Sequence, residues 1–169
     1  LYHFLNLSSD ALFSVQKSEK EYKEEIDIDG HKVTILFTKD IGVSKNRNNL
    51  LDNVSRDIII NIDDDCPLVD NYISIVENSF REYNGAEFIL FNGIVTHENN
   101  RLIHNKNTKR VCKFNDVSYA GGPGLVYKRE TINKYKLRYN NNVGYPNKIQ
   151  AGEDSLFIKD IVSSKANFI

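Results

Sequence analysis

Three consecutive aspartates at 63–65 follow the apolar run 58–62 and are the side chains of this chain best suited to chemistry. A run of β-branched residues bounded by polar ones predicts a buried strand. Adjacent carboxylates repel one another unless a cation or hydrogen-bond donors offset their charge. Ligands of open α/β sheets bind beyond the carboxyl ends of the strands, and hard divalent cations prefer oxygen ligands. The triplet therefore predicts a site for a divalent cation and a phosphate-bearing substrate, the alternative being an acidic turn that caps the next helix.

A second pattern, Gly-Val-Ser-Lys-Asn-Arg-Asn at 42–48, predicts a glycine turn that opens a helix with Arg47 and Asn48 in its first turn. Backbone N–H groups at a helix start favour an anion, and Arg adds a forked, permanently charged donor. This pattern predicts phosphate binding, unless Arg47 is a surface residue on a capped helix.

Two more patterns lie in the second half of the chain. Ala-Gly-Gly-Pro-Gly at 120–124 lacks side chains that would keep a ligand from the backbone, although a tight turn explains it equally well. Glu153 and Asp154 follow a glycine at the start of the last predicted helix, where acidic residues suit the helix dipole. A carboxylate in that position can also act as a general base directed at a pocket.

The sequence predicts alternating strands and helices, and these elements position the residues named above. Apolar runs predict strands at 11–15, 58–62, 87–91, 94–96 and 125–127, and three- and four-residue apolar spacing predicts helices at 44–54, 70–83, 131–135 and 153–164. Ser44 is the predicted N-cap of the first helix. The dipeptide Asp29-Gly30 predicts a type I′ hairpin within 26–37, and the charged stretch 17–25 predicts a solvated connection. The alternation indicates an α/β fold with a mainly parallel sheet flanked by helices.

Composition limits the function further. The chain has 169 residues, of which 40% are hydrophobic, so a single domain with a sizeable core is expected. The net charge is −1, with 22 basic and 23 acidic residues, and no nucleic-acid partner held by bulk electrostatics is expected. The chain contains no Met, which predicts that Leu1 is not a natural start and that this is a partial domain.

The ordered patterns at 42–48, 57–65 and 152–157 resemble the G-x-S-x-x-R-N, D-I-x-x-x-x-D-D-D and G-E-D-S/T-x-F signatures of family 2 glycosyltransferases. These GT-A fold (Rossmann-like) enzymes build bacterial surface polysaccharides. The resemblance covers roughly residues 5 to 165. It implies an inverting transfer from a nucleotide-diphosphate sugar, with a UDP-sugar favoured, to a saccharide or lipid-linked acceptor. It also implies a cytoplasmic protein. Peripheral association with the inner face of the plasma membrane is compatible with that location.

The resemblance also implies a role for each matching residue. Arg47 and Asn48 match donor-contacting positions, and Asp154, with Glu153 beside it, matches the catalytic base. Mn²⁺ or Mg²⁺ would be held by Asp65 and Asp63. The remaining donor-binding positions that the resemblance implies are Asp63, Asp64, Gln16, Gly121 and Gly122.

The resemblance also implies that residues 1–169 are one partial catalytic domain, without the fold's first strand and helix and its C-terminal elements. An inactive glycosyltransferase-like binding module remains the main alternative. A haloacid dehalogenase phosphatase would have Thr or Val where Pro67 stands, and a nucleotidyltransferase would need an early glycine-rich loop.

Overall fold

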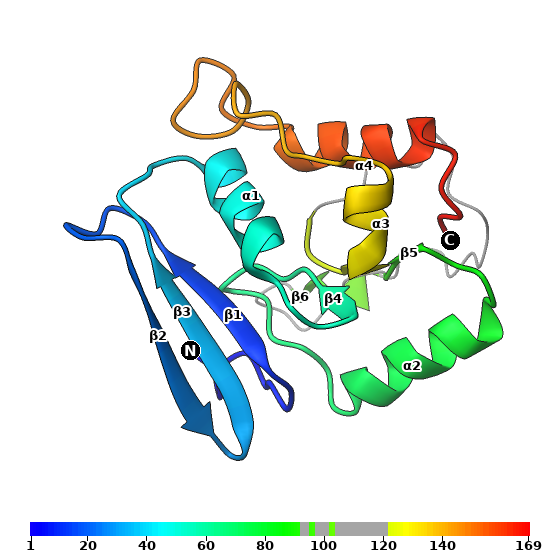
Figure 1. Ribbon diagram of the computed structural model, residues 1–169. Coiled ribbons are helices and arrows are strands. Elements are labelled where there is room, and N and C mark those ends of the chain that lie inside the picture. The colour runs from blue at the N-terminus through cyan, green and yellow to red at the C-terminus, as the bar shows by residue number, and fades with distance from the viewer. Residues whose placement is uncertain (92–94, 97–101, 104–121) are drawn as a thin grey trace.

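The computed structural model describes residues 1–91, 95–96, 102–103 and 122–169 (Figure 1). The described part forms a mixed α/β fold with two small three-stranded sheets and four helices. Its elements, in chain order, are β1 (Ala11–Val15), β2 (Tyr22–Ile28), β3 (His31–Phe37), α1 (Val43–Asn53), β4 (Ile58–Ile60), α2 (Tyr72–Glu82), β5 (Phe88–Leu90), β6 (Val95–Thr96), β7 (Leu102–Ile103), β8 (Leu125–Lys128), α3 (Arg129–Lys134) and α4 (Glu153–Ser163).

The first sheet has the strand order β1-β3-β2, with β1 parallel and β2 antiparallel to β3. The predicted hairpin is confirmed, because Asp29 (φ 55°) and Gly30 (φ 82°) both take the positive φ that a type I′ turn requires. The predicted connection 17–25 is partly wrong, since its last four residues begin β2. That strand is solvated along nearly its whole length, so its charged residues suit an exposed edge of the sheet.

The second sheet has the order β4-β8-β5, and both of its strand pairs are antiparallel. The expected mainly parallel sheet is therefore wrong, since β1–β3 is the one parallel pair within the described three-stranded sheets. The reason is that β4 and β5, connected through α2, run in the same direction but do not touch. Strand β8 lies between them and runs the other way, a choice of neighbour that hydrophobic patterning does not encode.

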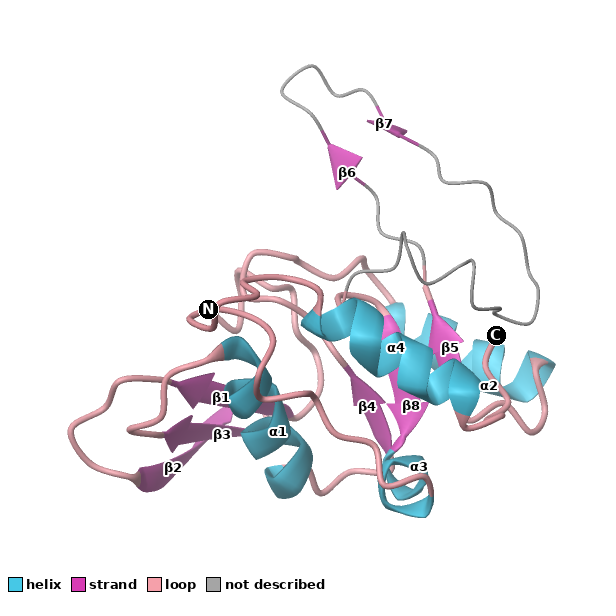
Figure 2. Ribbon diagram, turned by 90° about the horizontal axis from the view of Figure 1, so that it is seen from above, coloured by secondary structure: helices cyan, strands magenta, loops and turns pink. Residues whose placement is uncertain are grey.

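The core lies between the second sheet and the helices that cover it. Figures 1 and 2 show α4 on one face of this sheet and α2 on the other. Phe157 and Ile161 of α4 are fully buried against Phe88 of β5 and Leu125 of β8, and Phe168 near the C-terminus joins them. The apolar spacing of the last predicted helix therefore identified Phe157 and Ile161 as residues of its buried face.

Helix α1 begins differently from the prediction. Gly42, with φ 137°, is its N-cap, and Ser44 lies inside the helix rather than capping it. Ser44 is buried, and its hydroxyl donates to the carbonyl oxygen of Val143 at 2.6 Å. Burial against a segment nearly a hundred residues away thus outweighs the preference of Ser for the cap position.

The remaining predicted elements are found with shifted ends. Strand β4 ends at Ile60, although Asn61 still donates its N–H to Leu125 and accepts from Gly124. Residue 94, the glycine at 121 and most of the segment between them lie outside the described residues. No helix in the described ranges is long and apolar enough to cross a membrane.

Candidate functional site

Arg47 of α1 joins two carboxylates that are far from it in sequence. Its Nη2 lies 3.1 Å from Oδ1 of Asp63, which follows β4, and 3.3 Å from Oδ2 of Asp154, which opens α4. Only 12% of the Arg47 side chain is exposed. Burial alone would lower the pKa of Arg47, but Tyr139, Asp154 and Asp63 outweigh it and raise that pKa. A permanently charged guanidinium therefore lies at the point where α1, the end of β4 and α4 meet.

Asp154 is the carboxylate with the most unusual surroundings. Its Oδ2 accepts the backbone N–H of Gly122 at 3.1 Å as well as the contact from Arg47. Its Oδ1 is buried and has no hydrogen-bond partner among the residues that the structure describes. Burial raises the pKa of Asp154; Arg47 opposes this shift, and the neighbouring Glu153 adds to it. A raised pKa makes a carboxylate a stronger base, which suits a group that takes a proton from a substrate.

Gly122 has a steric reason to be a glycine. A Cβ on this residue would lie 2.6 Å from Nη1 of Arg47 and 2.7 Å from Oδ1 of Asp154. Its carbonyl oxygen accepts from Nδ2 of Asn61 at 3.0 Å, which ties it to the end of β4. The sequence associated this glycine with a ligand, and the structure places it against Arg47 and Asp154.

Tyr139, which the sequence analysis missed, lies beneath the guanidinium. The Cζ atom of Arg47 is 5.5 Å from the centre of the Tyr139 ring, which in turn stacks on Phe157 at 4.1 Å with an interplanar angle of 5°. Burial raises the pKa of the Tyr139 hydroxyl far above its ordinary value, so the phenol stays neutral. No local pattern marks this residue, because it lies in an irregular segment between α3 and α4.

Asn48 holds that segment in place. Its side-chain oxygen accepts the N–H of Tyr139 at 2.8 Å, and its Nδ2 donates to the carbonyl oxygen of Tyr139 and to Oδ1 of Asn141. These bonds are made within the chain, so Asn48 acts on the site by positioning Tyr139. Gln16, another predicted donor contact, accepts the N–H of Gly42 at 2.7 Å and fixes the start of α1.

One aspartate of the acidic triplet joins Arg47 and Asp154, and the other two face the solvent. Asp63 contacts Arg47, whereas Asp64 and Asp65 lie in an exposed turn. Asp65 accepts the S–H of Cys66 at 3.3 Å, and burial, with these carboxylates nearby, raises the pKa of that thiol to about 11. The described residues contain no group of three or more side chains arranged as metal ligands. Asp65 nevertheless fits a cation such as Mg²⁺, which commonly binds through one or two carboxylates and completes its shell with water and substrate phosphates.

Glu153 points away from this arrangement. Its buried Oε2 has no hydrogen-bond partner within the described ranges and would lie 3.2 Å from a Cβ on Gly144. It therefore packs against the segment that precedes α4, whereas Asp154 packs against Arg47. The predicted Gly121 lies outside the described residues.

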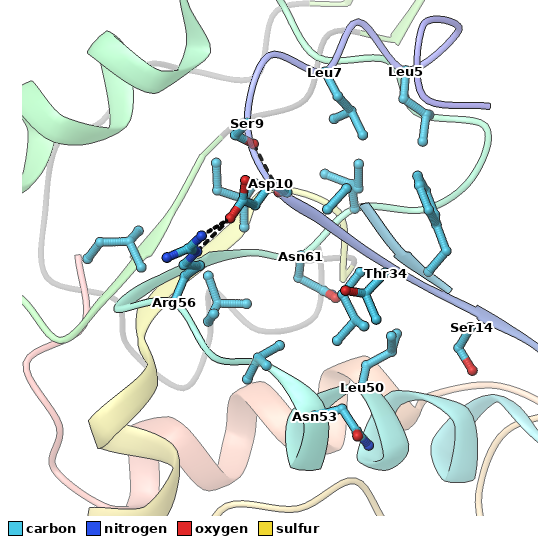
Figure 3. A pocket seen from close by; sticks show the side chains of 18 of the residues that line it. Leu5, Leu7, Ser9, Asp10, Ser14, Thr34, Leu50, Asn53, Arg56 and Asn61 are labelled. Carbon is cyan, nitrogen blue, oxygen red and sulfur yellow. Dashed lines mark hydrogen bonds and ion pairs between the residues drawn. The ribbon is translucent and has the colours of Figure 1, made fainter. Parts of the chain in front are cut away.

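Arg47 and Asp63, which form a cluster with Gly122 and Asp154, line a cavity of ≈1460 Å³ between the two three-stranded sheets (Figure 3). Gln16, Arg47, Asp63, Asp64 and Tyr139 line one part of it. Four predicted residues thus come together as Arg47, Asp63, Gly122 and Asp154, two more (Asn48 and Gln16) support them, and Asp64, Asp65 and Glu153 lie apart.

No protein-family model matches the chain, and no curated protein matches its sequence. The geometry of this cluster and the chemistry of its side chains are therefore what indicates a function.

Proposed function

We propose that the chain is the catalytic part of an inverting glycosyltransferase of the GT-A type. One observation carries the proposal: Arg47, Asp63, Gly122 and Asp154 come from four separate segments and meet at one point, where Arg47 and Asp63 line a cavity. A buried cation, exposed carboxylates and a basic carboxylate are the groups that transfer from a nucleotide-diphosphate sugar requires.

Asp154 is the general base of the proposed reaction. Its carboxylate takes the proton of an acceptor hydroxyl while that hydroxyl oxygen forms a bond to the anomeric carbon of the donor sugar. The bond between the anomeric carbon and the diphosphate oxygen breaks, and the diphosphate leaves with the electron pair. A single displacement inverts the anomeric configuration and needs no protein nucleophile. The raised pKa of Asp154 supports this role, because a stronger base accepts the proton more readily.

Arg47 is the residue that holds the diphosphate. Its guanidinium is partly buried, lies over an aromatic ring and carries a fixed charge that the leaving diphosphate can pair with. Mn²⁺ or Mg²⁺ at Asp65, with Asp63 and Asp64 beside it, would supply Lewis-acid stabilisation of the diphosphate. Exposed carboxylates at the end of β4 suit this because the metal takes its other ligands from phosphate and water.

The donor of this proposal is a nucleotide-diphosphate sugar, with a UDP-sugar favoured, and the acceptor is a saccharide or a lipid-linked saccharide. A lipid-linked acceptor implies a cytoplasmic enzyme that associates peripherally with the inner face of the plasma membrane.

A non-catalytic binding module is the second candidate. It is supported by the ion pairs themselves, because Oδ2 of Asp154 already contacts both Arg47 and Gly122. Such a module would bind the donor through Arg47 without transferring the sugar.

Replacement of Asp154 by Asn separates the two candidates. Asn is nearly isosteric but cannot take a proton, so the variant should bind UDP-sugars in the presence of Mn²⁺ as the wild type does, measured by calorimetry. Transfer to an acceptor saccharide should fall by ~10²–10⁴-fold, the usual contribution of a positioned base. Glu153→Gln is the matched control and should retain most of the activity, because Glu153 packs elsewhere. Donor binding without transfer in the wild type would favour the binding module, and equal transfer by wild type and Asp154→Asn would exclude Asp154 as the base.

A further inference from the structure

Strand β2 has an unpaired edge that faces the solvent. Among the strands that the structure describes, β2 pairs only with β3, and it does so over all seven of its residues. Figure 1 shows it as the outermost strand of the first sheet, on the side of β3 away from β1. All of its residues except the last are exposed. An edge of this length is a template for another strand of suitable chemistry.

The pairing of β3 shows which backbone groups of β2 point outward. Thr38 donates its N–H to Val15 of β1, so the preceding residue, Phe37, directs its backbone groups to the other side. Phe37 lies opposite Tyr22 of β2, and the two form a hydrogen-bonded pair. The two-residue hairpin turn at 29–30 fits the same alternation, because the residues that flank it also form such a pair. The N–H and C=O groups at the free edge therefore belong to Lys23, Glu25 and Asp27.

The charges of β2 favour one register for its antiparallel pairing with β2 of a second copy. The outward groups of both strands meet when the two-fold axis passes through residue 24, 25 or 26. An axis at Glu24 would place this residue opposite its own copy, and an axis at 26 would place Glu25 opposite Asp27. Like charges directly opposite each other are destabilising. An axis at Glu25 instead places Lys23 opposite Asp27 of the second copy, twice in each dimer.

The one like-charge pair that remains in this register, Glu25 opposite its own copy, is already offset. The Glu25 carboxylate lies 2.6 Å from Nζ of Lys23 and 2.7 Å from Nζ of Lys32. Asp27 accepts the N–H of Gly30 through Oδ1 at 3.0 Å and forms no ion pair with another described residue. This face of the edge therefore carries as many positive as negative side chains, and Asp27 can pair with Lys23 of the second copy.

The opposite face of β2 exposes large apolar side chains. Tyr22 is 47% exposed and Ile26 is 45% exposed. The ring of Tyr22 stacks on Phe37 at 4.2 Å with an interplanar angle of 3°, which places it on the same face of the sheet as that residue. With the axis at Glu25, Tyr22 lies opposite Ile28 of the second copy, and the two copies of Ile26 are diagonal neighbours. Pairing in this register would remove apolar surface from water.

We propose that two copies of this chain associate through antiparallel pairing of their β2 strands, with the two-fold axis at Glu25. The two first sheets then form one sheet with the order β1-β3-β2-β2-β3-β1. Each Lys23–Asp27 pair and the central Glu25 pair exchange two backbone hydrogen bonds. The charges of the edge restrict pairing to this partner and register, since other strands would face like charges. The proposal is independent of the glycosyltransferase activity, because β2 contributes no residue to the cluster of Arg47, Asp63, Gly122 and Asp154.

Sedimentation equilibrium of the chain at increasing concentration tests the association. The chain should shift from monomer to dimer, and Lys23→Glu should raise the dimer Kd by at least ~10-fold because both Lys23–Asp27 contacts become repulsive. Asp27→Lys should do the same, whereas the double variant Lys23→Glu/Asp27→Lys restores opposite charges and should recover most of the wild-type affinity. Lys148→Glu is the matched control, because it changes the net charge equally at an exposed residue outside β2, and it should leave the Kd unchanged.

Disulfide cross-linking tests the register, in a chain whose Cys66 and Cys112 are replaced by Ser. Glu25→Cys should form a disulfide-linked dimer on mild oxidation, because the Cα atoms of a hydrogen-bonded pair lie about 5.5 Å apart, within disulfide range. Glu24→Cys is the matched control and should cross-link at least ~10-fold more slowly, since its copies are diagonal neighbours about 7–8 Å apart.

Three results would overturn the proposal. The first is sedimentation as a monomer up to about 1 mM, which would show that the β2 edges do not bind each other. The second is a dimer whose Kd is the same in the wild type and in Lys23→Glu, which would place the interface elsewhere. The third is cross-linking of Glu24→Cys as fast as that of Glu25→Cys, which would exclude the register.

Discussion

Gly122→Ala perturbs the centre of the site by a single methyl group. A Cβ there would lie 2.6 Å from Nη1 of Arg47 and 2.7 and 2.8 Å from Oδ1 and Cγ of Asp154. Ordinary contact begins near 3.4 Å, so Arg47 would have to retreat by about 0.8 Å. Gly122 does not have a positive φ, so alanine brings no backbone strain and the cost is steric. Overpacking of this kind costs ~1–3 kcal/mol, which for a chain of this size lowers Tm by roughly 2–12 °C.

A double-mutant cycle, measured by urea unfolding, tests whether the contact of the added Cβ with Asp154 causes the loss of stability. In an Asp154→Ala background two of the three close contacts disappear, and Arg47 becomes the end of a flexible side chain that can move away. Gly122→Ala should then cost less than ~0.5 kcal/mol, which gives a coupling energy of roughly 0.5–2.5 kcal/mol or more between positions 122 and 154. Additivity within ~0.3–0.5 kcal/mol would refute the packing of Gly122 against Asp154.

The remaining predictions concern the cation, the metal and a distant ion pair. Arg47→Ala should reduce calorimetric affinity for UDP by at least ~10-fold while Arg47→Lys, which keeps the charge, recovers part of it; a fall in Tm with affinity unchanged would make Arg47 structural. Asp65→Asn should abolish the Mn²⁺ dependence of donor binding with Tm unchanged, since its side chain is exposed, and a retained Mn²⁺ dependence would move the metal elsewhere. Burial alone would raise the pKa of Glu87, but bonds from Lys134, the N–H of Asn167 and Tyr135 outweigh it and hold that pKa below its ordinary value. The stabilisation by ionised Glu87 is therefore present above about pH 4.5 and is lost as pH falls further. In the Glu87→Gln variant, Tm should fall less steeply below about pH 4.5 than in the wild type. Parallel pH profiles of Tm for the two proteins would contradict this.

Most of the local structure could be read from the sequence because it depends on neighbours in the chain. Asp29 and Gly30 adopt positive φ without help from the rest of the fold, so the hairpin was predictable. The apolar run that became β4 and the spacing that buries Phe157 and Ile161 were predictable for the same reason. The order of the four polar patterns along the chain also indicated the candidate site residues, namely Arg47, the acidic triplet, the glycine segment and Asp154.

Only the tertiary structure decided which strands are neighbours and which side chains meet. Side-chain periodicity specifies a buried face but neither the partner of a strand nor its direction, so the position of β8 between β4 and β5 was not predictable. The contacts of Arg47 with Asp63 and Asp154 span 16 and 107 residues of chain, and Tyr139 reaches this site through Asn48 rather than through any local pattern. Ser44 shows the same limit, because a hydroxyl that suits a helix cap is instead buried against Val143 once the chain folds back on α1.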